Sequence, residues 1–245
     1  MTVVFEELDY QETPLGVISL RRRSEPRLNN QILYEIKLDD EFLMSSLFTE
    51  AEIQLSKICL AALDGNELDV IVGGLGLDYT AKAALEHASV RSLKVVDVMA
   101  PVIDWHQRGL VPLGKELSAD PRCTLIHADF FDVATSKTKD FDGLNYQEDA
   151  PRPQVHAVLL DIDHSPGYWL NPGNSAFYTE QGLRDLSEKI LSGGVFGLWS
   201  DEPPAPDFMA LLDRIFESSE SHVVSFPNPY LGENSTNTVY LARKA

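Results

Sequence analysis

Residues 70–80 read VIVGGLGLDYT, an apolar run broken by glycines and followed by a helical pattern. An apolar strand that ends in glycines before a helix is typical of a ligand-binding loop, because glycine allows positive φ and a close approach of the backbone to a ligand. The strict dinucleotide pattern requires a further glycine where this chain has Tyr79. Alone, the motif therefore indicates a ligand loop at Gly73, Gly74 and Gly76 without choosing the ligand.

Strand and helix patterns alternate around this loop. Apolar strand patterns lie at residues 68–74, 92–98, 122–130, 155–163 and 195–201, and helical patterns lie at 78–88, 101–114, 179–194 and 205–218. This alternation predicts an α/β fold with a mostly parallel sheet and helices on both faces. The last two apolar segments, 221–229 and 235–244, have no helix between them, so we expect an antiparallel hairpin at one edge. Glycines 193 and 194 predict the end of the helix over 179–194.

The first 48 residues have a different pattern. Short apolar segments separated by turn residues predict strands there, and a helical pattern begins after Thr49, a residue type suited to an N-cap. We therefore expect a small N-terminal β extension over residues 1–48 and a Rossmann-like nucleotide-binding catalytic domain over residues 49–245.

The chain is acidic, with 20 Lys and Arg against 38 Asp and Glu and a formal net charge of −18. This charge repels phosphate backbones, so we expect no nucleic-acid partner, whereas a small cationic substrate would be attracted. No apolar run has the length of a membrane span, and the acidic start MTVVFEELDYQET does not resemble a signal peptide. We therefore expect a cytoplasmic protein with no membrane partner.

No residue pattern points to a metal. Cys59 and Cys123 match no metal spacing and are expected to be buried reduced thiols. His127 and His156 lie in apolar strand patterns and are expected to be core histidines. We therefore expect no metal site.

Acidic residues follow the carboxyl ends of successive predicted strands. Asp97 lies about twenty residues after the glycine loop, the spacing of a carboxylate that binds a ribose, although it could instead cap the next helix. Asp129 ends the third strand, where it could accept from an adenine amino group. The segment LLDIDHSP ends the fourth strand and contributes Asp161, Asp163 and His164. Because ligands bind at this edge of a parallel sheet, the set predicts an adenosine ligand beside a cluster of acids.

With these elements, the chain resembles the spermidine synthase (aminopropyltransferase) family within the class I S-adenosylmethionine-dependent methyltransferase fold. The resemblance covers about residues 38–243. It is carried by VIVGGLGLDYTAKAALEHASVRSLKVVDV, DPRCTLIHADFFD, VHAVLLDIDHSPG and NSAFYTEQGLRDLSEKILSGGVFGLWS. It implies a sulfonium nucleotide as co-substrate, either decarboxylated S-adenosylmethionine or S-adenosylmethionine. It also implies a small cationic amine or other small molecule as acceptor, and it suggests a homodimer formed through the N-terminal strands.

The resemblance also implies roles for single residues. The loop from Gly74 to Asp78 would surround the methionine-derived part of the nucleotide, Asp97 would bind ribose and Asp129 would bind adenine. In the acceptor half, Asp161 matches the family's acid that takes the proton from the attacking amine. Tyr178 matches the tyrosine of the FYT motif near the amine site, although a tyrosine at this position could equally belong to the core. His164 could act as a base or bond the neighbouring loop.

The chain departs from the family in the amine half. The family's GGGDGG loop is GGLGLD here, and its D-S-S-D-like run is D-I-D-H, so the second acid is shifted to Asp163 or replaced by His164. Leu55 and Ser56 stand where a Tyr-His pair is expected. Three functions stay open: an aminopropyltransferase, a small-molecule methyltransferase, and a non-catalytic nucleotide-binding or assembly module. A methyltransferase needs a cation for the substrate carboxylate, and Lys82 is the candidate near the loop.

Overall fold

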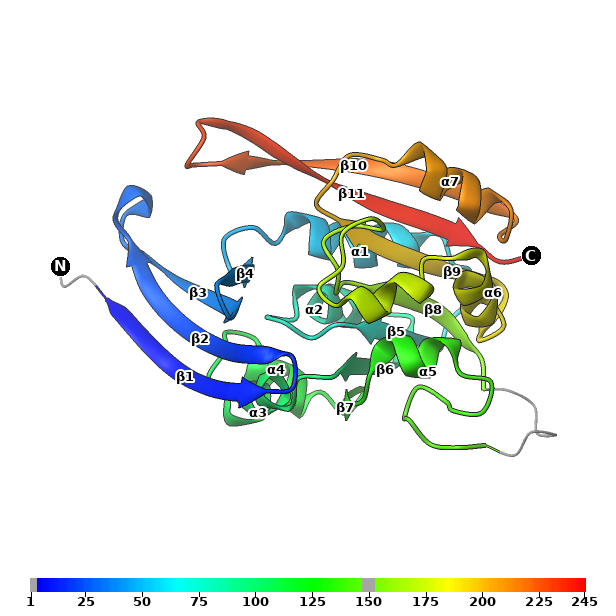
Figure 1. Cartoon of the computed structure of the whole chain (residues 1–245), viewed down its shortest axis with the longest axis horizontal. Coiled ribbons are helices and arrows are strands. Elements are labelled where there is room, and N and C mark those ends of the chain that lie inside the picture. Colours follow the sequence, from blue (N-terminus) through cyan, green and yellow to red (C-terminus); the bar gives the residue numbers. More distant parts are fainter. Residues whose placement is uncertain (1–3, 147–152) are drawn as a thin grey trace.

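The computed structural model describes residues 4–146 and 153–245, which form two β-sheets with helices packed on the larger one (Figure 1). The smaller sheet is antiparallel and its strands follow chain order. They are β1 (Phe5–Thr13), β2 (Gly16–Glu25), β3 (Gln31–Leu38) and β4 (Glu41–Ser45), with a short 3-10 turn, η1 (Pro26–Leu28), after β2.

The larger sheet has seven strands in the order β10-β11-β9-β8-β5-β6-β7. Its strands are β5 (Leu68–Gly73), β6 (Val90–Asp97), β7 (Cys123–His127), β8 (Val155–Leu160), β9 (Ile190–Ser200), β10 (Ser218–Asn228) and β11 (Glu233–Arg243). Strands β5 to β9 are parallel, and β10 and β11 form an antiparallel hairpin that pairs with β9. The predicted α/β fold, mostly parallel sheet and antiparallel C-terminal edge are therefore confirmed.

Seven helices and a second 3-10 turn connect the described strands. They are α1 (Glu50–Ala61), α2 (Tyr79–Leu85), α3 (Ala100–Arg108), α4 (Gly114–Ala119), α5 (Phe130–Thr135), η2 (Pro172–Ala176), α6 (Glu180–Ser187) and α7 (Pro206–Asp213). Thr49 stands at the N-cap position of α1, but its side chain makes no capping hydrogen bond.

Two hydrophobic cores lie on the two faces of the larger sheet, because alternate side chains of a strand point to opposite faces. Val70 and Val72 of β5 face α1 to α4, whereas Ile71 faces α5 to α7. The first core also contains Ile18 and Ile36 of the smaller sheet. Since the two sheets share a core, the domain boundary after residue 48 stays a prediction.

One predicted boundary is wrong. Helix α6 ends at Ser187, and β9 already begins at Ile190, so the glycine pair does not end the helix. The pairing of β8 with β9 jumps from Val155–Ile190 to Ala157–Val195, which makes the glycine segment a bulge within β9. A glycine pair suits this position because Gly193 has φ +76° and a Cβ on Gly194 would lie 2.7 Å from the carbonyl oxygen of His156.

No helix in the described ranges is both long enough and apolar enough to cross a membrane.

Candidate active site

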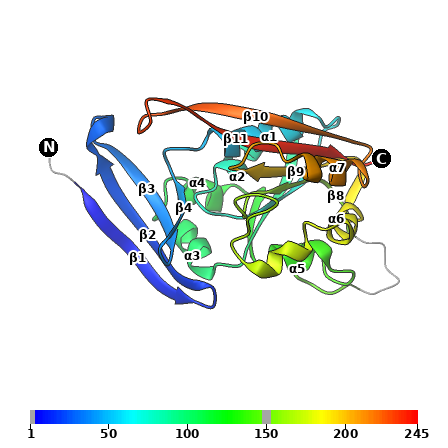
Figure 2. The same cartoon turned by 45° about the horizontal axis from the view of Figure 1, so that its top comes forward.

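A cavity of about 830 Å³ lies at the carboxyl ends of the parallel strands. Its wall combines the loop after β5, the ends of β6, β8 and β9, the start of α1, and the smaller sheet. Figure 2 shows the smaller sheet beside this end of the larger one. The volume is in the range of pockets that enclose a small-molecule ligand, at the edge where parallel sheets bind their ligands.

The glycine loop is held tightly between β6 and β8. The Gly74 N–H donates to the carbonyl oxygen of Val96 (2.9 Å), and the Asp161 N–H donates to that of Gly73 (2.8 Å). Gly74 has φ +96°, and a Cβ there would overlap the main-chain carbonyl of Asp161. Gly76 has φ +45° and packs against the sulfur of Met44 in β4. Both glycines line the cavity, so the backbone of this loop is open to a ligand.

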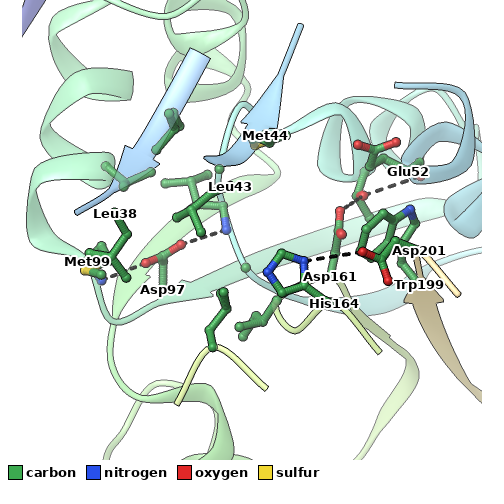
Figure 3. A pocket seen from close by; sticks show the side chains of 18 of the residues that line it. Leu38, Leu43, Met44, Glu52, Asp97, Met99, Asp161, His164, Trp199 and Asp201 are labelled. Atoms are coloured by element: carbon green, nitrogen blue, oxygen red, sulfur yellow. Dashed lines mark hydrogen bonds and ion pairs between the residues drawn. The ribbon is translucent and has the colours of Figure 1, made fainter. Parts of the chain in front are cut away.

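Asp97 organises this loop from the end of β6. Its Oδ2 accepts from the Leu75 N–H (2.8 Å) and its Oδ1 accepts from the Met99 N–H (2.7 Å). Burial raises the pKa of Asp97, and these backbone hydrogen bonds oppose that rise. A carboxylate has about four acceptor sites, so Asp97 can still accept from a further donor. Figure 3 shows Asp97 at one end of the cavity, beside Leu38, Leu43 and Met99.

Asp161 and Glu52 lie at the other end of the cavity (Figure 3). Asp161 Oδ2 accepts from the Thr80 hydroxyl (2.7 Å), and burial raises the Asp161 pKa to about 6. Glu52, on the first turn of α1, is only 8% exposed, and burial together with the Asp161 charge raises its pKa well above the usual range. The sequence analysis did not select Glu52. Its spacing from Leu55 and Cys59 places the three residues on one face of the helix, which could have indicated that this acid is buried.

Two further predicted acids line the cavity with different surroundings. Asp78 is in the left-handed region at φ +69°, is 2% exposed, and has no hydrogen-bond partner for either carboxylate oxygen among the described residues. Burial raises the pKa of Asp78. Asp129 instead caps α5, accepting from the N–H groups of Phe131 (2.9 Å) and Asp132 (3.4 Å).

Three predicted site residues do not line the cavity: Gly73, Asp163 and Tyr178. Gly73 packs on the ring of Phe130. Asp163 is 1% exposed and accepts from the Leu170 N–H (2.8 Å), the Asn174 amide (2.9 Å) and the Tyr178 hydroxyl (2.9 Å). Tyr178 takes the core position that the sequence left open for it, and a role of Asp163 at the acceptor stays a prediction. After β8 the chain leaves the sheet, so its side chains no longer point alternately to the two faces of the sheet. The hydrogen bonds of Asp163 instead connect the residues of the segment that follows β8.

His164 lines the cavity and connects its two sheets. Its Nε2 lies 3.0 Å from Glu41 Oε1 of β4, and its Nδ1 lies 3.5 Å from Asp201 Oδ2 after β9. The ring also stacks on Tyr168, with centroids 4.9 Å apart. Of the two roles that the sequence leaves open for His164, bonding to neighbouring segments is the one these contacts describe.

Comparisons with known proteins agree with this architecture. A spermidine synthase in complex with the transition-state analogue AdoDATO superposes with a TM-score of 0.72 at 15% identity, covering 98% of this chain and 74% of that one. The chain has the spermidine synthase fold. A spermidine synthase from Thermotoga maritima superposes with a TM-score of 0.71, also at 15% identity, covering 98% of this chain and 73% of that one.

A curated relative is also found in sequence. Polyamine aminopropyltransferase 2 of Pseudomonas aeruginosa is 25% identical over 170 residues, which is 65% of this chain and 43% of the relative. The chain therefore spans less than half the length of that protein. No family model matches the chain. The resemblance predicted from the sequence is thus confirmed in fold and by a distant relative.

Within this spermidine synthase fold, the described cavity wall contains no lysine or arginine. Lys82 does not line it, because its ammonium pairs with Glu116 (2.7 Å) and Glu86 (3.2 Å). A cation for the carboxylate of S-adenosylmethionine is therefore missing from the described wall.

The remaining histidines and cysteines lie apart from the site. His127 is exposed and His156 is half-buried, so the expectation that both are core residues is wrong. His127 bonds the carbonyl oxygen of Val98 (3.1 Å), and His156 Nδ1 accepts from the Asp69 N–H (3.0 Å). Both cysteines are free thiols; Cys59 is buried and Cys123 only half-buried. The described residues contain no group of three or more side chains able to hold a metal ion.

Proposed function

We propose that the chain is an aminopropyltransferase that binds decarboxylated S-adenosylmethionine and transfers its aminopropyl group to a small cationic amine. One observation supports the proposal: the glycine loop, the Asp97 carboxylate and the partly exposed Asp161 carboxylate face the same cavity. In this proposal the backbone from Gly74 to Asp78 surrounds the sulfonium side chain. Asp97 accepts from the ribose hydroxyls, and Asp129 lies beside the adenine.

The residues at the far end of the cavity suit the acceptor. An amine arrives as an ammonium ion and must lose one proton before its nitrogen can attack. Asp161 can hold that ion and accept its proton, because it is an ionised carboxylate above a pH of about 6. The nitrogen lone pair then attacks the carbon bonded to sulfur. The carbon–sulfur bond breaks with its electron pair going to sulfur, which becomes a neutral thioether. In-line placement of these three atoms supplies much of the acceleration.

The described cavity wall favours the decarboxylated nucleotide. S-adenosylmethionine carries a carboxylate that a buried site must neutralise or hydrogen-bond, whereas the charged lining residues of this cavity are almost all acidic. The aminopropyltransferase relative supports the same choice. Homodimerisation through the N-terminal sheet and a cytoplasmic location stay predictions.

Calorimetric titration with decarboxylated S-adenosylmethionine and, separately, S-adenosylmethionine tests the proposal. We expect tight binding of the decarboxylated form. Asp97→Ala should abolish that binding, and Asp161→Asn should retain it while abolishing turnover. Asp104→Ala is the matched control, since Asp104 is an acid of α3 that pairs with Arg108 away from the cavity.

The other outcomes assign the protein differently. Preference for S-adenosylmethionine would make it a methyltransferase. Binding of neither nucleotide would leave a non-catalytic module. Equal loss of binding and turnover in Asp161→Asn would refute the role of Asp161 as the base.

A further inference from the structure

We propose that Glu52 is a second acidic residue of the acceptor site and that Glu52 and Asp161 together bind the ammonium group of the acceptor. This inference rests on the proposed transfer to an amine. It replaces the expectation that the second acid comes from the segment after β8, where Asp163 is already held by three donors outside the cavity.

Glu52 is a buried acid without a cationic partner among the described residues. Its residue is 8% exposed and lines the cavity, and the hydrogen bond recorded for its carboxylate is to its own main chain, with no cationic side chain of the described residues paired to it. An ionised carboxylate in such a position is unfavourable unless a cation joins it. The surrounding wall supplies no lysine or arginine, so that cation must come from a ligand.

Glu52 and Asp161 are placed together by Thr80 at the start of α2. The Thr80 hydroxyl donates to Asp161 Oδ2 (2.7 Å) and lies 3.4 Å from the main-chain carbonyl oxygen of Glu52. Figure 3 shows the two acids on the same side of the cavity, away from Asp97. Two carboxylates can share an ammonium group, because that group has three donors and no acceptor.

Aromatic side chains line the same cavity. They include Phe48, Trp199 and Phe226, from the segment before α1, from β9 and from β10. Apolar walls limit the water around a bound ion, which strengthens its attraction to the two carboxylates. A bound ammonium favours the ionised form of both carboxylates, so that both hold the ion and Asp161 is available to take its proton.

The test compares Glu52→Gln with Glu50→Gln. Both substitutions replace a carboxyl group by an amide in the first turn of α1, but Glu50 is exposed, bonds Gln54 (2.9 Å) and does not line the cavity. Wild type and both variants are titrated calorimetrically with putrescine, n-butylamine and phenylethylamine. Each titration is run with and without saturating 5′-methylthioadenosine, the thioether that aminopropyl transfer would leave. Melting temperatures are measured for all three proteins.

We expect wild type to bind at least one of these amines and Glu52→Gln to weaken that binding by about tenfold or more, which corresponds to one lost charged contact. Glu50→Gln should bind as wild type does, and all three proteins should bind the thioether equally. Glu52→Gln should melt no lower than wild type, because a neutral amide of similar size replaces a carboxyl group whose ionisation burial disfavours.

Three results would overturn the inference: no amine binds wild type, Glu52→Gln binds the amine unchanged, or Glu52→Gln melts well below both other proteins, as expected for a structural role. The thioether titration separates this inference from the proposed function. If wild type binds amine through Glu52 but binds no nucleotide, the proposed transferase fails and the acceptor site stands.

Discussion

Replacing Gly74 by alanine tests whether the loop needs its close contact with β8. An alanine at φ +96° is strained, and its Cβ would lie 2.9 Å from the main-chain carbonyl carbon of Asp161 and closer still to its oxygen. That carbonyl cannot move freely, because the Asp161 N–H is bonded to Gly73 (2.8 Å). The substitution should therefore destabilise the fold and displace both the loop and Asp161.

The magnitude has two parts. Left-handed backbone strain costs about 1–2 kcal/mol for a residue with a Cβ. Overpacking against a fixed backbone adds about 1–3 kcal/mol. The sum is about 2–5 kcal/mol, and for a chain of this size each kcal/mol lowers the melting temperature by about 2–4 °C.

Gly65→Ala is the matched control, because Gly65 has φ +117° and no atom within 4 Å of an added Cβ. Gly65→Ala should lose only the stability that corresponds to left-handed backbone strain, about 1–2 kcal/mol. The assay is urea denaturation together with calorimetric titration of decarboxylated S-adenosylmethionine. Gly74→Ala should lose at least about tenfold in affinity, whereas Gly65→Ala should bind as wild type does. Equal stability of the two variants with unchanged binding by both would refute the reasoning.

Two other substitutions test buried carboxylates. Burial raises the pKa of Asp78 above its value in the unfolded chain, so its stabilising effect is full below a pH of about 4 and is lost as the pH rises through the folded-state pKa. Asp78→Asn should therefore raise the melting temperature near neutral pH and flatten its fall between acid and neutral pH; an unchanged pH profile would contradict this. Asp163→Ala leaves three buried donors without an acceptor and should destabilise by about 3–5 kcal/mol in urea, whereas the exposed Asp132→Ala should not. A stable Asp163→Ala protein that fails to bind amines would return Asp163 to the acceptor site.

The nucleotide half of the cavity could be predicted from the sequence because it depends on local rules. Strand, loop and helix patterns place the ends of β5, β6 and β8 at one edge of a parallel sheet whatever the connections between them. Asp97 and Asp161 follow directly from this rule. Gly74 follows as well, since a loop between two paired strands needs a residue without a Cβ.

The acceptor half could not be predicted in the same way, since its residues come from separate parts of the chain. Glu52 reaches the cavity because α1 packs against α2, β9 and β11, and that packing is not visible in local periodicity. Asp163 is two residues beyond Asp161, and an alternating strand would place both on one face. The chain leaves the sheet after Leu160 and turns back through a bridge between Ser165 and Tyr168, so the two acids point to different surroundings.

Ser56 shows how a departure from the family pattern can still support the site. It stands where a Tyr-His pair is expected, but its side chain is fully buried and its hydroxyl donates to the carbonyl oxygen of Thr80 (2.6 Å). Thr80 in turn donates to Asp161 (2.7 Å). A larger side chain at position 56 would have to displace α2 and, with it, the hydroxyl that orients Asp161. The small Ser56 side chain therefore lets α1 pack on α2, and that packing brings Glu52 beside Asp161.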